Sequence, residues 1–254
     1  MPPIYLDERT ARQQIADTAR EIYQRKLSGA ADGNLSIRLG PDRIATTPSG
    51  VHKGRLTPND IVIVDAHGKP LSRGKPSSEI ALHTKAYVMR PEIGAVIHAH
   101  PPMAIAYQLA GGRLSEVLVS EVVFACGEIA TAPYTTPTTG QVPEVLAEYL
   151  KCYDVILLAR HGSVTLGPDL DTALVRLDAL EHTALIYCQV KMMGGAQPIA
   201  ASEVDRLFAI AKPQTPPYRR QNNACPAPEP ASSSADEDAL VRAVLRALSA
   251  RNDA

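Results

Sequence analysis

Apolar residues recur along this chain at two spacings, one typical of helices and the other of strands. From Asp7 to Leu27 they fall three or four positions apart and Gly29 follows, which predicts an amphipathic helix. The run Pro76-Ser77-Ser78-Glu79 predicts a second helix start with a hydroxyl available as a cap, and Pro91 limits that helix at about Arg90. Further helices are predicted over residues 103–109, 142–150 and 170–193.

Short apolar runs separate these helices and predict strands. Their ranges are 35–39, 43–46, 61–65, 95–100 and 154–160. Several of these strands are joined by turns too short for the crossover that a parallel pair requires. We therefore expect an α/β fold in which a mixed or mainly antiparallel sheet lies between helices.

The composition changes after about Lys212. Residues 213–237 are rich in Pro and Ser and almost free of aliphatic residues, which predicts a linker that cannot fold alone. Residues 238–254 carry an apolar stripe at helical spacing and predict a short amphipathic helix. We therefore divide the chain into one folded domain over residues 1–212, the linker and this terminal helix.

The bulk composition argues against several classes of partner. The chain has 254 residues and a formal net charge of −1, so we expect neither a nucleic acid nor a membrane as partner. No apolar run approaches the ~20 residues of a membrane span, and the first residues show no export signal. The four cysteines lie far apart, which predicts free thiols in a reducing compartment. These observations predict a soluble cytoplasmic protein.

Two histidines end the predicted strand that begins at Ala95. Side chains at positions i and i+2 of a strand point to one face, so the imidazoles of His98 and His100 converge. Pro101 and Pro102 then end the strand, because proline cannot donate to a sheet ladder. The pair is half of a metal site, although two polar side chains on a solvent-facing strand explain it equally well.

His161 is the third metal ligand that we predict. It follows the apolar run 155–158 in the turn Arg160-His161-Gly162, where a side chain can project from the sheet edge. Three histidines without a cysteine are typical of a catalytic zinc or a similar divalent ion that keeps a fourth position open. The other histidines lie in predicted helices or loops and are weaker candidates: His52, His67, His83 and His182.

Glu79 lies at a helix start, and on position alone it satisfies the helix dipole. Ser77 and Ser78 before it add hydroxyls and free amide donors, which form a natural oxyanion or phosphate cradle. The turns Gly33-Asn34-Leu35-Ser36 and Thr47-Pro48-Ser49-Gly50 offer similar groups. Each turn is common by itself, but three of them beside three candidate metal ligands indicate an anion-binding site.

In order and spacing, these motifs resemble the class II aldolase/adducin family over roughly residues 7–210, and most of all its L-fuculose-phosphate aldolases. The resemblance implies an α/β/α sandwich around a mainly antiparallel sheet, and a homotetramer with active sites between subunits. It also implies one zinc ion per subunit on His98, His100 and His161, with Glu79 as the acid/base. The residues implied for the substrate phosphate are Asn34, Ser49, Gly50, Ser77 and Ser78.

The reaction implied by this resemblance is zinc-dependent retro-aldol cleavage of a ketose 1-phosphate to dihydroxyacetone phosphate and an aldehyde such as lactaldehyde. Two departures from the family pattern leave the identity of the aldehyde undetermined. Ala31 stands where the aldolases have a threonine, and a tyrosine expected within residues 119–124 is missing. Tyr218 is the candidate for a catalytic tyrosine that reaches a neighbouring subunit.

Alternatives exist on the same scaffold. Pentulose-5-phosphate 4-epimerases usually carry aspartate where Glu79 stands, and sugar-acid phosphate decarboxylases and a thioribulose-phosphate dehydratase are further relatives. Adducin heads are non-enzymatic binding modules that lack the metal histidines. The predicted terminal helix over 238–254 resembles encapsulation peptides that dock on a bacterial microcompartment shell protein. A frayed terminus, or a helix that docks on a neighbouring subunit, explains it equally well.

Overall fold

A seven-stranded sheet forms the centre of the protein. The computed structural model describes residues 5–136, 141–211 and 225–226. The strands are β1 (Asn34–Gly40), β2 (Arg43–Thr46), β3 (Val62–Asp65), β4 (Ala95–Ala99), β5 (Ile129–Ala132), β6 (Val155–Leu158) and β7 (Gly162–Gly167). They lie in the order β3-β2-β1-β4-β7-β6-β5. Neighbouring strands are antiparallel except β5 and β6, so the mainly antiparallel sheet is confirmed with one parallel pair.

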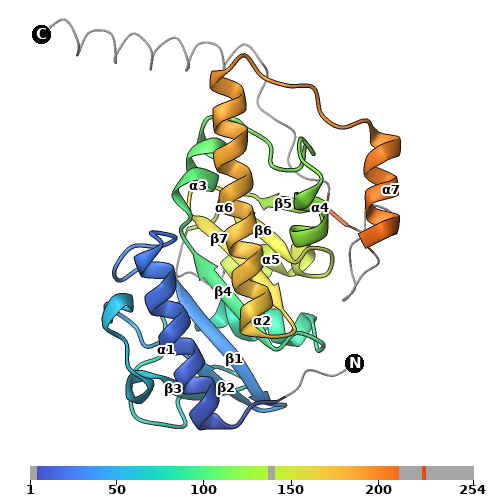
Figure 1. The fold of residues 1–254 in the computed structure, drawn as a ribbon. Helices are drawn as coiled ribbons and strands as arrows, with labels where there is room; N and C mark the ends of the chain where they lie inside the picture. The colour runs from blue at the N-terminus through green and yellow to red at the C-terminus, as the bar shows by residue number, and fades with distance from the viewer. Residues whose placement is uncertain (1–4, 137–140, 212–224, 227–254) are drawn as a thin grey trace, which may run out of the picture.

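Helices cover both faces of this sheet (Figure 1). They are α1 (Glu8–Gln24), α2 (Ile80–Met89), α3 (Pro102–Leu109), α4 (Glu121–Cys126), α5 (Gln141–Leu150), α6 (Leu170–Met192) and α7 (Ala201–Ala211). Apolar side chains of α1 and α6 pack on one face, and those of α2 and α5 pack on the other. Helices α3 and α4 pack against α6, and α7 packs outside α4. This is the predicted three-layer α/β/α arrangement.

The alternation of side chains along β1 and β4 decides which residues face α2. On β1, Leu35 and Ile37 belong to the core under α1, so Asn34 and Ser36 point to the opposite face. On β4, Ile97 likewise faces α1, which turns His98 toward α2. The pairing register places Asn34 directly opposite His98. One face of the sheet centre is therefore polar although it is buried.

The sequence analysis missed four elements: α4, β5, β7 and α7. Strand β7 is buried along its whole length, but glycines bound it and interrupt the apolar pattern. The strand predicted over 154–160 ends at Leu158, because the chain turns there into β7. The predicted hydroxyl cap of α2 is also wrong. Glu79 occupies the N-cap without a side-chain cap bond, and Ser77 Oγ accepts from the Glu79 N–H at 3.2 Å.

The prediction of four free thiols is wrong for two cysteines. Cys152 and Cys225 form a disulfide across 73 residues, and Tyr153 Oη donates to the Pro226 carbonyl at 2.7 Å. Cys126 and Cys188 are free. Cys225 packs against the core under α5, a long-range contact that cysteine spacing does not reveal. These two cysteines therefore give no support to a reducing compartment.

No helix among the described residues is both long enough and apolar enough to cross a membrane. Most of the predicted linker, the predicted terminal helix and Tyr218 lie outside the described residues. Their proposed roles, including docking on a microcompartment shell, stay predictions.

A buried ion cluster ties α2, the start of β6 and α6 together. The Asp154 carboxylate lies 2.8 Å from the guanidinium of Arg90 and 2.6 Å from that of Arg176. All three side chains are nearly inaccessible to solvent. Arg90 also donates to the Leu150 carbonyl at 3.0 Å. The carboxylate therefore pairs with both guanidinium groups inside the protein, and Arg90 pairs with Glu92 as well.

We expect Asp154→Ala to lower the free energy of unfolding by about 3–5 kcal/mol, because the buried guanidinium of Arg176 loses the carboxylate that pairs with it. Urea denaturation followed by circular dichroism measures this change. The control is Glu203→Gln, which breaks an exposed pair with Arg206 and should cost less than about 1 kcal/mol. Equal stabilities for the two variants would contradict the prediction.

Candidate active site

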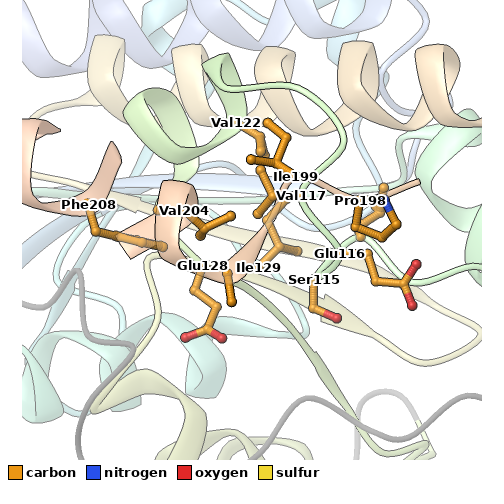
Figure 2. A pocket seen from close by; sticks show the side chains of 13 residues that line it. Ser115, Glu116, Val117, Val122, Glu128, Ile129, Pro198, Ile199, Val204 and Phe208 are labelled. Atoms are coloured by element: carbon orange, nitrogen blue, oxygen red, sulfur yellow. The ribbon is translucent and has the colours of Figure 1, made fainter. Parts of the chain in front are cut away.

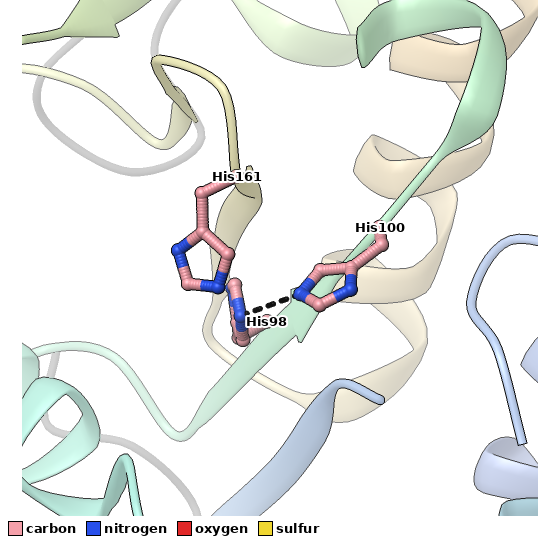
Figure 3. Close-up of side chains that lie close together, drawn as sticks. All are labelled: His98, His100 and His161. Atoms are coloured by element: carbon pink, nitrogen blue, oxygen red, sulfur yellow. Dashed lines mark hydrogen bonds between the residues drawn. The ribbon is translucent and has the colours of Figure 1, made fainter. Parts of the chain in front are cut away.

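The structure brings the three predicted histidines together at one end of the central strands (Figure 3). His98 lies on β4, His100 follows the last residue of that strand, and His161 lies in the turn between β6 and β7. Their potential ligand nitrogens all lie within 4.8 Å of one another. Among the described residues this is the single group of three potential metal ligands. That these residues bind a metal stays a prediction.

Local backbone features hold His161 against the other two rings. Arg160 has a positive φ of 60°, an uncommon conformation for a residue with a side chain, and it turns the chain just before His161. Gly162 follows where no side chain fits. A Cβ there would lie 2.5 Å from the Ala99 carbonyl oxygen and 2.6 Å from the ring of His100. The close approach of the hairpin to β4 therefore requires glycine.

The electrostatics of the cluster favour neutral imidazoles. Burial, with a smaller effect of His161, lowers the pKa of His98 to about 3. Burial and then His98 lower the pKa of His100 to about 4. His98 Nδ1 lies 2.9 Å from the Ser163 carbonyl, to which it can only donate, so Nε2 keeps its lone pair. That nitrogen lies 3.1 Å from His100 Nε2, and neutral nitrogen donors so close together fit a divalent cation.

Glu79 lies beside this cluster, at the N-cap of α2. Its Oε2 atom is 3.3 Å from His98 Nε2, and its Oε1 atom is 3.5 Å from His161 Nε2. Asn34 Nδ2 donates to the same carboxylate at 2.8 Å. The carboxylate is thus held within reach of anything that the imidazoles bind, which is the geometry that a general acid/base needs.

A cavity of about 220 Å³ opens next to the cluster. All five residues predicted for an anion line it: Asn34, Ser49, Gly50, Ser77 and Ser78. Backbone bonds from Ser49 to Lys75 at 2.9 Å and from Ser77 to Thr47 at 3.1 Å hold the two serine turns together. His100, His161 and Glu79 line the same cavity. Hydroxyls, a carboxylate and imidazoles therefore face one space.

The sequence analysis missed two residues of this cavity and considered a third residue, His83, only as a weak metal ligand. Lys53 and Asp32 line it, and the Lys53 side chain is buried, which lowers its pKa. One signal could have identified Lys53: it lies three residues after Gly50, in the same segment between β2 and β3. His83 is fully buried beneath the cavity, hydrogen-bonded to Asn34 and Ser36. It lies outside the histidine cluster, as its weak candidacy implied.

A second cavity of about 210 Å³ lies under α7, away from the histidines (Figure 2). Apolar side chains line part of it, with Val117, Val122, Ile199, Val204 and Phe208 among them. Two glutamates at its edge are its only titratable side chains among the described residues. It has no set of groups for acid/base or metal chemistry, so we assign the reaction to the histidine cavity.

Comparisons with known proteins agree with this fold. A model of the class II aldolase and adducin N-terminal domain matches residues 13–188. The chain belongs to the class II aldolase and adducin family. It is 36% identical over 203 residues to a methylthioribulose-1-phosphate dehydratase of Methylococcus capsulatus, covering 73% of this chain and 95% of the relative.

Relatives with aldolase names are also similar. An L-fuculose phosphate aldolase of Methanococcus maripaludis is 34% identical, covering 65% of this chain and 89% of the relative. The crystal structure of L-fuculose-1-phosphate aldolase from Thermus thermophilus superimposes with a TM-score of 0.64 at 28% identity. That alignment covers 76% of this chain and 98% of the other. The family is shared, whereas the named reactions differ.

We expect His161→Ala to weaken zinc binding by at least about 10–100-fold, because one of three imidazole ligands is removed. Loss of a group that only hydrogen-bonds a ligand already has an effect of that size. Competition with a chromogenic chelator measures the affinity. His182→Ala, on the exposed side of α6, is the matched control and should bind like wild type. Equal affinities for both variants would show that the cluster is not the metal site.

The buried His83 makes stability depend on pH. Burial lowers its folded-state pKa from 6.5 to about 3, so between these values the unfolded chain binds a proton that the folded chain excludes. Stability should therefore fall as the pH drops through this window. His83→Gln should lower the slope of the free energy of unfolding against pH by about 1.4 kcal/mol per pH unit, which corresponds to one proton. Urea titrations from pH 7 to pH 4 measure it, and parallel curves would contradict the assignment.

Proposed function

We propose that the chain is a divalent-metal-dependent lyase that cleaves a ketose 1-phosphate between C3 and C4. The products are dihydroxyacetone phosphate and an aldehyde, as with an L-fuculose 1-phosphate substrate. The observation that carries the proposal is the Glu79 carboxylate, 3.3 and 3.5 Å from two of the three clustered imidazoles. The same cavity holds the hydroxyl-rich turns that suit a phosphate.

The imidazoles would hold the cation through neutral nitrogens, for which zinc is a suitable ion. When bound, a cation there supplies Lewis acidity, which polarises the C2 ketone and stabilises negative charge developing on its oxygen. A cation held there would border the cavity, which His100 and His161 line. No lysine Schiff base is required for this chemistry.

The protein's own groups would bind and orient the phosphate. Ser49, Ser77 and Ser78 line the cavity and offer hydroxyls, and Gly50 brings its backbone close without a side chain. Lys53 adds a buried ammonium, whose present contacts are the carbonyls of residues 31 and 51 at 3.3 Å. A cation in this place offsets substrate charge, which fits a phosphorylated sugar better than a neutral one.

Glu79 would move a proton from the C4 hydroxyl to C3. As the C3–C4 bond breaks, the C4 oxygen becomes the aldehyde carbonyl and its proton passes to the Glu79 carboxylate, and the carboxyl group so formed delivers that proton to the electron pair left on C3. In the direction of condensation, the Glu79 carboxylate removes that proton again. The position of the carboxylate beside the imidazoles supports this role, because C3 is next to the ketone that they would orient.

Dehydration of a ketose 1-phosphate is the second candidate. In that reaction Glu79 takes the C3 proton, and the C4 hydroxyl leaves as water, so the same carboxylate serves. The 36% identity to a methylthioribulose-1-phosphate dehydratase favours it. The homotetramer and the role of Tyr218 stay predictions from the family resemblance.

The test is an assay of the purified protein with L-fuculose 1-phosphate and with 5-methylthioribulose 1-phosphate, with and without a chelator. Dihydroxyacetone phosphate is measured with glycerol-3-phosphate dehydrogenase, and loss of one water by mass spectrometry. We expect triose phosphate release that the chelator abolishes, and Glu79→Gln should slow it about 10²–10⁴-fold. Loss of water without release of triose phosphate would show that the reaction is dehydration and not cleavage. No turnover by the metal-loaded protein would contradict the proposal.

A further inference from the structure

A row of buried polar side chains leads from the core between β1 and α2 to Glu79. Tyr87 Oη lies 2.8 Å from Ser36 Oγ, which lies 2.7 Å from His83 Nδ1. His83 Nε2 lies 2.5 Å from Asn34 Oδ1, and Asn34 Nδ2 donates to Glu79 Oε2 at 2.8 Å. Ser36 and His83 are fully buried, and Asn34 is nearly so. The row therefore meets the cavity at its Asn34 and Glu79 end.

The hydrogen bonds of this row have only one consistent direction. Asn34 faces the Glu79 carboxylate with its NH₂ group, since an amide oxygen there would meet another acceptor. Its oxygen must then accept from Nε2–H of His83. The lowered pKa of His83 leaves the ring with a single proton, so Nδ1 accepts from the Ser36 hydroxyl. Ser36 in turn accepts from Tyr87. Each side chain fixes the orientation of the next.

The row ends at Glu79, the residue proposed to transfer the proton. Among the described residues, the Glu79 carboxylate contacts Asn34, His98 and His161. The two imidazoles are the proposed metal ligands, so Asn34 is the partner that is independent of the metal. Glu79 sits at the N-cap of α2 but makes no cap bond with its side chain, so the helix itself does not hold its carboxylate. The amide of Asn34 is what remains to orient it.

We propose that His83 is a positioning residue: through its Nε2–H it holds the Asn34 amide in the orientation that donates to Glu79. This inference rests on the proposed role of Glu79 as the proton carrier. It gives the Asn34 amide the task of holding Glu79 in place of the phosphate contact that the family resemblance implies, because both ends of the amide are taken by Glu79 and His83. His83 itself touches neither substrate nor metal. Its loss should lower kcat and leave KM and the metal content unchanged.

Three variants distinguish a positioning role of His83 from a role in the stability of the fold alone. His83→Met removes the donor to Asn34 and should lower kcat about 10- to 100-fold with KM within threefold of wild type. His83→Gln keeps an N–H donor at the far end of the side chain and should recover most of kcat. Tyr87→Phe removes the far end of the row while leaving the link from His83 to Glu79. It should lower the urea midpoint but keep kcat within threefold.

A second measurement needs no turnover. In long-range ¹H–¹⁵N spectra of the full-length protein, His83 should appear as the Nε2–H tautomer at neutral pH. A His83 Nδ1–H tautomer or an imidazolium would overturn the proposal even if His83→Met fails to fold. Equal losses of kcat in His83→Met and Tyr87→Phe would also overturn it, as would loss of metal or a change in KM alone. If the wild type turns over no ketose phosphate, the proposed function fails, and the tautomer still tests the row.

Discussion

The register of β1 against β4 is the constraint on which the rest of the structure depends. It sets Asn34 opposite His98 at the centre of the sheet. Because side chains alternate, a shift of β1 by one residue against β4 would turn Asn34 toward α1 and into an aliphatic core, while His98 stayed on the face toward α2. The apolar side chains of Leu35 and Ile97 on the other face specify this register. Apolar packing under α1 thus determines where the polar face under α2 lies.

A polar face in a buried sheet is stable only when its groups are paired. An unpaired buried donor or acceptor costs about 1–3 kcal/mol. Here Ser36, His83 and Asn34 satisfy one another, and His98 donates from Nδ1 to the Ser163 carbonyl. The Nε2 atom of His98 instead points at the other imidazoles. Burying this nitrogen lowers the stability of the folded chain, and a bound cation would satisfy its lone pair.

Much of the fold and the site could be predicted from the sequence because the signals are local. Helical spacing located the helices that begin near Asp7 and Leu170, and strand alternation placed His98 and His100 on one face. Elements without a local signal were missed. Helix α4 has only 6 residues, and β7 is bounded by glycines. The disulfide and the roles of Lys53 and His83 depend on contacts between distant segments, which spacing along the chain does not encode.

The central claim is that three imidazoles bind one cation beside Glu79. X-ray absorption at the zinc edge of the loaded protein tests it most directly. The account predicts three imidazole nitrogens at about 2.0–2.1 Å with oxygen in the remaining shell, and no sulfur. A sulfur shell at about 2.3 Å, or a spectrum with fewer than two imidazoles, would contradict it.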